Sequence, residues 1–260
     1  MLFSLDKLKV YDRALASTAS LIQLSAGWDK RHAVVDQLVR ASESVVVNIA
    51  EGARLRGIAN RQHVMDYAIG SALECAACLD IALRKEFLAP TLALDSKASL
   101  CQVVKMLVGL RKSWAADQLH EPSASYGGQE KPLFGHERLQ AYQLGLEFMG
   151  WLHGLPGGPE LSNRWLRQID KAGTSLVLNI AEGNGRCMEA DRRQFLETAE
   201  SATVKAGSFL DLSHRVGAVD PQQRIEGIAL LDRIGLLVRG LCERLNRSIP
   251  GRTEPGIDKV

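Results

Sequence analysis

Aromatic residues, prolines and long apolar runs are all scarce in this chain of 260 residues. Aromatics make up 5% of it and only 8 residues are proline, which is the composition of a soluble globular protein. No apolar run approaches the roughly 18 residues of a membrane span, so we expect none. Residues 1–9 lack the apolar block and cleavage site of a secretory signal, and we expect a cytoplasmic protein.

Cysteine is also scarce, and its pattern is not that of a disulfide framework. The five cysteines are odd in number and irregularly placed, which favours reduced thiols. Cys75 and Cys78 have a metal-type spacing, but they lie among alanines with no second pair, so core packing is the favoured interpretation. The six histidines show no ligand spacing and no phosphate-binding glycine pattern is present. We therefore expect no metal and no cofactor.

The chain has no large excess of charge of either sign. There are 32 Lys and Arg against 30 Asp and Glu, a net charge of +2. Residues 1–117 carry 15 − 12 = +3 and residues 133–260 carry 16 − 16 = 0. Nucleic-acid-binding domains usually show a clearer basic excess. Any such binding would need a local basic patch instead of a global field.

What the chain does contain is an internal repeat. The stretch from Ser44 to Gly52 returns as Ser175 to Gly183, at an offset of 131 residues, and nine of the sixteen positions from 37 to 52 are identical. Two copies of one module follow from this similarity. The offset holds without a gap far beyond the motif: Leu8, Tyr11, Leu15, Arg61, Ala68, Leu79, Asp80, Arg84, Leu100, Gly109 and Leu110 are all repeated.

Apolar residues recur at spacings of three and four along both copies, which predicts α-helices. The run Val45-Val46-Val47 alone is compatible with a strand, but the second copy has leucine at 176 and 178, which favours a helix. The predicted helices cover about 5–22, 30–52, 59–87, 91–116, 136–153, 161–183, 188–216 and 221–247.

Several residues predict where these helices end or begin. Gly52 and Gly183 are natural helix stops. Asp220 and Pro221 have the pattern of an N-cap followed by a proline at the first helical position.

Four helices with short connections favour an antiparallel bundle. The prediction is an all-α chain of two tandem antiparallel up-down four-helix bundles. The first bundle takes residues 1–117 and the second 134–248. Residues 118–133 have the glycine, serine and proline content of a flexible linker, and residues 249–260 form a loose tail.

A row of polar residues runs along the second helix of each module. Such a stripe beside aliphatic residues is open to three interpretations: a hydrogen-bond network that fixes helix register, a recognition surface, or a catalytic site. The network is favoured, because neither glutamate has a partner acid or histidine nearby in sequence, and no enzyme is expected. The stripe comprises Gln37, Ser44, Asn48 and Glu51 in module one and Gln168, Ser175, Asn179 and Glu182 in module two, with a basic residue at 40 and at 171.

Basic residues gather on and after the repeated motif. Guanidinium groups on a loop and a helix start are suited to phosphate contacts, although a solvated charged rim is the alternative. The candidate nucleic-acid-binding residues are Arg40, Arg54, Arg56, Arg61, Lys171, Arg186, Arg192 and Arg193.

The motif resembles the signature of the "four helix bundle protein" family. That family includes proteins encoded in intervening sequences of bacterial large-subunit ribosomal RNA genes and the accessory variability protein of diversity-generating retroelements. The run from Asn179 to Arg186 is the closer match, whereas the first copy departs from the signature after Gly52. Module one keeps a Gly-Ser-x-x-Glu pattern at Gly70, Ser71 and Glu74, where module two has Ser201, Ala202 and Lys205.

This resemblance implies a four-helix bundle that commonly assembles as a pentameric barrel and has no enzymatic activity. It implies RNA or DNA and a reverse transcriptase as partners. The expected function is that of a non-enzymatic nucleic-acid-binding or reverse-transcriptase accessory protein, and the chain is expected to form homo-oligomers. The alternative is a structural module that acts through protein–protein contacts without nucleic acid.

Overall fold

The computed structural model describes residues 8–55, 57–116 and 132–247. Over these residues the chain is helical and contains no strand, which confirms the all-α prediction and places Val45-Val46-Val47 in a helix. The helices are α1 (Lys9–Ser25), α2 (Ala33–Arg54), α3 (Ile58–Arg84), α4 (Pro90–Ala116), α5 (Gln140–His153), α6 (Arg164–Gly185), α7 (Glu189–Arg215) and α8 (Pro221–Arg247), with a short 3-10 helix, η2 (Gly135–Arg138), before α5.

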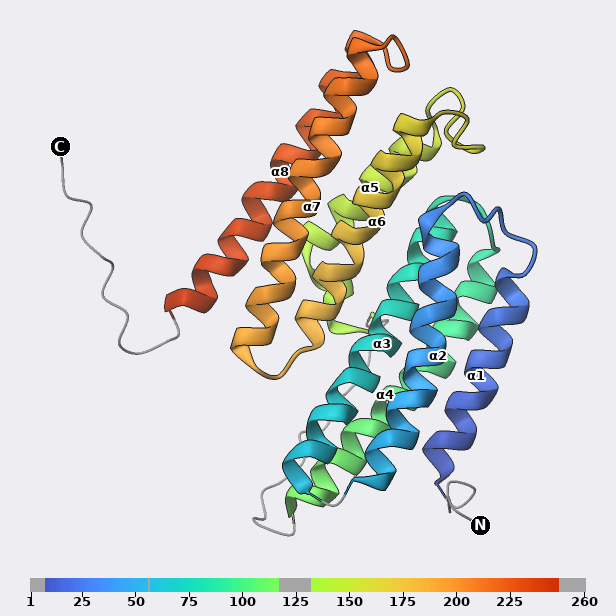
Figure 1. Ribbon diagram of the computed structural model, residues 1–260, viewed down its shortest axis with the longest axis vertical. Coiled ribbons are helices and arrows are strands. Elements are labelled where there is room, and N and C mark those ends of the chain that lie inside the picture. The colour runs from blue at the N-terminus through green and yellow to red at the C-terminus, as the bar shows by residue number, and fades with distance from the viewer. Residues whose placement is uncertain (1–7, 56, 117–131, 248–260) are drawn as a thin grey trace, which may run out of the picture.

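The helices form two four-helix bundles, as predicted (Figure 1). In the first, each helix from α1 to α4 packs on the next, and α1 also packs on α4. In the second, α5 to α8 pack in the same order and α5 packs on α8. Each bundle is therefore closed around its own apolar interior.

The two bundles also pack against each other, which the repeat alone does not predict. Helix α3 of the first bundle lies against α5 and α6 of the second, and α2 touches α6 (Figure 1). The buried apolar side chains of both bundles form one continuous cluster. Helix α3 is consequently buried on nearly all sides, including at Ile69, Leu73, Ala77 and Ile81. Apolar spacing predicted this helix, and its second buried face is the one that packs against module two.

The prediction that Gly52 and Gly183 stop their helices is wrong by two residues, because α2 continues to Arg54 and α6 to Gly185. Both glycines instead allow a neighbouring helix to come close. A Cβ at Gly52 would lie 2.2 Å from the terminal carbon of Met65, and one at Gly183 would lie 3.0 Å from Cβ of Phe195. The space that a side chain would fill is taken by the next helix of the same bundle.

The predicted start of α8 is confirmed at Pro221. The Asp220 carboxylate accepts a hydrogen bond from the backbone N–H of Gln223 at 2.8 Å, and the Gln223 side chain accepts one from the backbone N–H of Asp220 at 3.0 Å. This reciprocal capping satisfies two amide groups that a helix start leaves unpaired.

Two predicted segments fall largely outside the described residues: nearly all of the linker at 118–133 and the whole tail at 249–260. Among the helices that the structure describes, none has the length and apolar content needed to cross a membrane.

Candidate nucleic-acid interface

The polar stripe on the motif helices makes mostly local hydrogen bonds. The Asn48 amide donates to the backbone carbonyl of Ser44 at 2.8 Å, and the Asn179 amide donates to that of Ser175 at 2.7 Å. The Ser44 hydroxyl also lies 2.8 Å from the hydroxyl of Ser71 on α3. The asparagines thus bond within their own helices, and Ser44 links α2 to α3.

The remaining stripe residues differ between the modules. Gln37 and Gln168 are half-buried and Glu51 is exposed on α2. Its counterpart Glu182 is half-buried and pairs with Arg186 at the end of α6. The repeated motif therefore has different surroundings in the two modules, because this end of α6 packs against α3 of the other bundle, whereas the corresponding end of α2 is exposed at Glu51.

Arg186 is a buried part of the contact between the bundles. Only 5% of the residue is exposed. Besides its pair with Glu182, its guanidinium lies over the rings of Phe195 and Tyr67, with 4.5 Å and 5.1 Å to the ring centroids. Sequence reasoning places Arg186 among the candidate phosphate ligands, but the structure places it between α6 and α3, away from solvent.

Gly70 on α3 makes room for this arginine. A Cβ at position 70 would lie 2.9 Å from Nη2 of Arg186 and 3.0 Å from Oε1 of Glu182. One turn later, burial and the nearby Glu182 carboxylate raise the pKa of Glu74 to about 7. The Gly-Ser-x-x-Glu pattern kept by module one thus faces the Glu-Gly-x-Gly-Arg pattern kept by module two. Each module has retained the half of the motif that lies at this contact.

Three other candidate arginines are engaged within the protein. The Arg192 guanidinium donates to the carbonyls of Gly183 and Asn184, both at 3.3 Å, at the end of α6. Arg193 pairs with Glu197 at 2.7 Å, and Arg61 donates to the carbonyl of Leu55. Arg56 lies outside the described residues.

Arg40, Arg54 and Lys171 are the candidates that remain exposed. Arg40 makes a solvent-exposed ion pair with Asp36, at 3.0 Å, one turn earlier on α2. Within the part of the chain that the structure describes, Arg54 and Lys171 have no ion-pair partner. We call these three residues, all on the motif helices α2 and α6, the motif-helix cations.

A buried ionic cluster that sequence reasoning missed lies at one end of the contact. The Lys85 ammonium donates to the Asp170 carboxylate and to Nδ1 of His32, the latter at 3.0 Å. Nε2 of His32 then donates to the carbonyl of Pro159 at 2.8 Å. Asp170 also accepts from the backbone N–H of Ala33 at 2.9 Å, so it caps the start of α2 in the other bundle.

A second missed cluster lies where module two begins. Nζ of Lys97 is 2.7 Å from Oδ1 of Asp80 and 2.6 Å from Oε1 of Glu137, and the Tyr142 hydroxyl donates to Asp80 at 2.8 Å. Asp80 and Lys97 belong to module one, and the other two to module two. Charges so far apart in the chain give no local sequence pattern, although the apolar residues all around α3 do indicate a second covered face.

Comparison with known proteins supports the repeat. The profile of the family described as "23S rRNA-intervening sequence protein" matches residues 6–109 and again residues 137–240. No curated protein and no solved structure matches the chain significantly. The two matched segments cover most of the chain and coincide with the two bundles. The chain therefore belongs to the 23S rRNA-intervening sequence protein family, as a tandem duplication of the family's module.

Proposed function

We propose that this protein is a non-catalytic, RNA-associated protein and that the motif-helix cations contact RNA phosphates. The observation that supports this most is that both bundles match a family whose name ties it to an intervening sequence of 23S rRNA. Binding of a reverse transcriptase, which the resemblance also implies, stays a prediction.

Burial and ion pairing leave only some of the candidate basic residues available to bind RNA. Arg186, Arg192 and Arg193 make contacts within the second bundle or between bundles. Arg40, Arg54 and Lys171 keep their charge at the surface, and the exposed Arg40–Asp36 pair is of the kind that contributes under about 1 kcal/mol. A phosphate can therefore replace Asp36 at little cost. Arg40 and Arg54 are fourteen residues apart, which is close to four helical turns, so they lie along one side of α2.

The first prediction concerns RNA affinity. Removing all three motif-helix cations (Arg40→Ala, Arg54→Ala, Lys171→Ala) should weaken binding of a labelled single-stranded RNA by up to about 100-fold at 0.1 M salt. It should also reduce the slope of log K against log salt by about 2, because each phosphate contact contributes about 0.7 for single strands. Fluorescence anisotropy at several salt concentrations measures both quantities.

The control removes three exposed cations elsewhere, with Lys105→Ala, Lys112→Ala and Arg233→Ala on α4 and α8. This variant has the same net charge as the first, so a difference between the two isolates the motif helices. Failure of the wild-type protein to bind RNA or single-stranded DNA of equal length at 50 mM salt would remove the proposal.

A second candidate function, self-assembly, is favoured by the exposed apolar residues. The contact between the bundles joins unlike faces: α3 of module one and α6 of module two. Leu178 on α6 is 4% exposed, whereas its repeat counterpart Val47 on α2 is 61% exposed. Leu73 on α3 is 6% exposed, whereas its counterpart Val204 on α7 is 64% exposed. The chain thus presents, on α2 and α7, exposed apolar counterparts of the two faces that pack between the bundles, which permits head-to-tail association of copies.

If copies associate this way, the apparent mass of the wild-type protein should rise with concentration. Val47→Asp and Val204→Asp should each abolish this rise, because they charge opposite halves of one contact. Ile225→Asp is the matched control, because Ile225 is 57% exposed on α8 and its counterpart Leu94 is also exposed, at 60%. Sedimentation equilibrium measures the mass. A wild-type protein that stays monomeric up to about 100 µM, well above a micromolar Kd, would exclude this candidate.

A further inference from the structure

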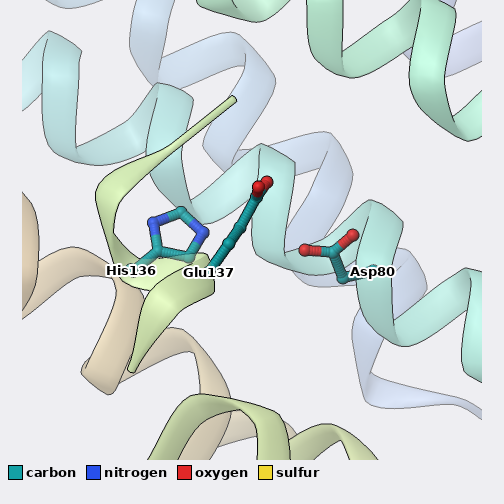
Figure 2. A group of neighbouring side chains, drawn as sticks. All are labelled: Asp80, His136 and Glu137. Atoms are coloured by element: carbon teal, nitrogen blue, oxygen red, sulfur yellow. The ribbon is translucent and has the colours of Figure 1, made fainter. Parts of the chain in front are cut away.

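Three potential metal ligands come together at the junction of the two bundles. Asp80 lies on α3, and His136 and Glu137 are neighbours in η2, the first element of module two (Figure 2). One ligand atom from each lies within 4.8 Å of the other two. A tetrahedral ion with bonds near 2.1 Å holds its ligands about 3.4 Å apart, so closure of the site requires shifts of little more than 1 Å.

His136 is the observation that points to a ligand. Its side chain is fully buried, yet neither ring nitrogen has a hydrogen-bond partner among the residues that the structure describes. The ring is instead held by aromatic contacts, stacked on Phe134 at 5.7 Å and edge-on to Tyr142 at 4.7 Å between centroids. An unpaired buried imidazole costs free energy that an ion would recover.

Lys97 supplies the only positive charge that pairs with the two carboxylates among the described residues. The cluster of Asp80, Glu137 and one ammonium therefore keeps a net negative charge. Oε1 of Glu137 lies 2.6 Å from the Lys97 ammonium and has no other partner within the described part of the chain. Lys97, Asp80 and Glu137 also line a cavity of about 390 Å³, which gives the ammonium a place to move and an ion a route in.

We propose that Asp80, His136 and Glu137 bind a divalent transition-metal ion, in the place that the Lys97 ammonium otherwise takes between the carboxylates. One imidazole nitrogen and two carboxylate oxygens suit Zn²⁺, Co²⁺ or Mn²⁺, with water from the cavity completing the coordination. The ion would join module one to module two.

The repeat does not duplicate this set of ligands in the sequence. By the repeat, the counterparts of Asp80 and Lys97 are Asp211 and Ile228, and those of His136 and Glu137 are Leu5 and Asp6. Of these four residues, only Asp80 and Glu137 have a counterpart that also carries a carboxylate. The ligand set thus belongs to the fused contact and not to the repeated module, and it goes beyond the proposed RNA-associated function.

The test uses the untagged full-length protein and Co²⁺ or Zn²⁺ as the probe. The wild-type protein should bind one equivalent of Co²⁺ with visible absorption bands, and Zn²⁺ should displace the Co²⁺ and raise the Tm. Lys97→Met should bind at least tenfold more tightly, because the competing ammonium is gone. His136→Gln and Glu137→Gln should lose at least 100-fold in affinity, whereas Asp211→Asn should change nothing.

The Lys97→Met variant separates a metal site from a structural ion-pair cluster. If Lys97, Asp80 and Glu137 only stabilise the junction as ion pairs, this variant should have a lower Tm and show no Co²⁺ spectrum. The absence of a Co²⁺ spectrum in folded wild-type protein, or Lys97→Met binding no more tightly than wild type, would overturn the proposal. Circular dichroism checks that each variant is folded.

Discussion

Replacing Asp170 with leucine should lower the free energy of unfolding by about 3–5 kcal/mol, the cost typical of breaking a buried ion pair. The variant leaves the Lys85 ammonium without its carboxylate in a site from which water is excluded, since Lys85 is 1% exposed. Burial lowers the pKa of Lys85, and Asp170 is what opposes that shift. The lysine should therefore be neutral in the variant near pH 7, which is how an unpaired buried amine usually escapes its desolvation cost.

The contacts around Asp170 explain why this one carboxylate matters to both bundles. It lies on α6 of module two, yet it accepts hydrogen bonds from Lys85 and from the first amide of α2, both in module one. Burial works against its ionisation, but the neighbouring His32, the Lys85 charge and these bonds outweigh burial and leave its pKa lowered. Its loss should loosen the contact between bundles as well as the start of α2.

A double-mutant cycle checks the physical cause. Lys85→Met alone should also cost about 3–5 kcal/mol, whereas Lys85→Met with Asp170→Leu should cost far less than the sum, because apolar pairs often replace buried ion pairs without loss. Chemical denaturation measures each step. Glu197→Gln, which breaks the exposed pair with Arg193, is the control and should cost under about 1 kcal/mol. Additive losses in the cycle would show that the two charges do not stabilise each other.

Glu74→Gln should make the protein progressively more stable than wild type as the pH rises from 5 to 8, by on the order of 2 kcal/mol at the upper end after allowance for partial exposure. The pKa of Glu74 is raised from 4.5 to about 7, first by burial and then by Glu182, while Arg40 and Arg186 act in the opposite direction. The folded protein thus holds a proton that the unfolded chain releases. The contribution of Glu74 to the free energy of unfolding is fully present below about pH 4.5 and is lost as the pH rises through 7.

Other groups titrate in the same range, so the variant must be compared with wild type at each pH. The lowered pKa of His136 acts in the opposite sense: the unfolded chain takes up a proton below about pH 6.5, and stability from this group is lost as the pH falls. Burial raises the pKa of Glu182, in the same direction as Glu74. Urea denaturation of Glu74→Gln and of wild type from pH 5 to 8 gives the difference in their free energies of unfolding. The contribution of His136 is the same in both proteins and cancels in this difference.

Glu147→Gln, at an exposed position on α5, is the control for replacing a carboxyl by an amide. A difference between Glu74→Gln and wild type that stays constant with pH would mean that Glu74 is ionised in the folded protein throughout this range.

Local patterns were sufficient for much of the fold. The repeat correctly favoured a helix at Val45-Val46-Val47, because the second copy has leucines there. Asp220 and Pro221 correctly predicted the start of α8, because capping depends on residues within one turn. The prediction that Gly52 and Gly183 end their helices was wrong, because a local pattern does not show what packs against a glycine. A glycine after an apolar stretch has the same local appearance whether it ends a helix or admits a neighbouring one, and here it admits Met65 or Phe195.

The sequence by itself determined two helical modules, their order and the motif shared by α2 and α6, since periodicity and self-similarity are carried by neighbouring residues. Only the tertiary structure decided that the modules pack through unlike faces, that Arg186 is buried, and that Asp170 meets Lys85 and Asp80 meets His136 and Glu137. Those contacts join residues of different modules, and their free energy depends on burial and on charge separation across a contact that no local pattern encodes.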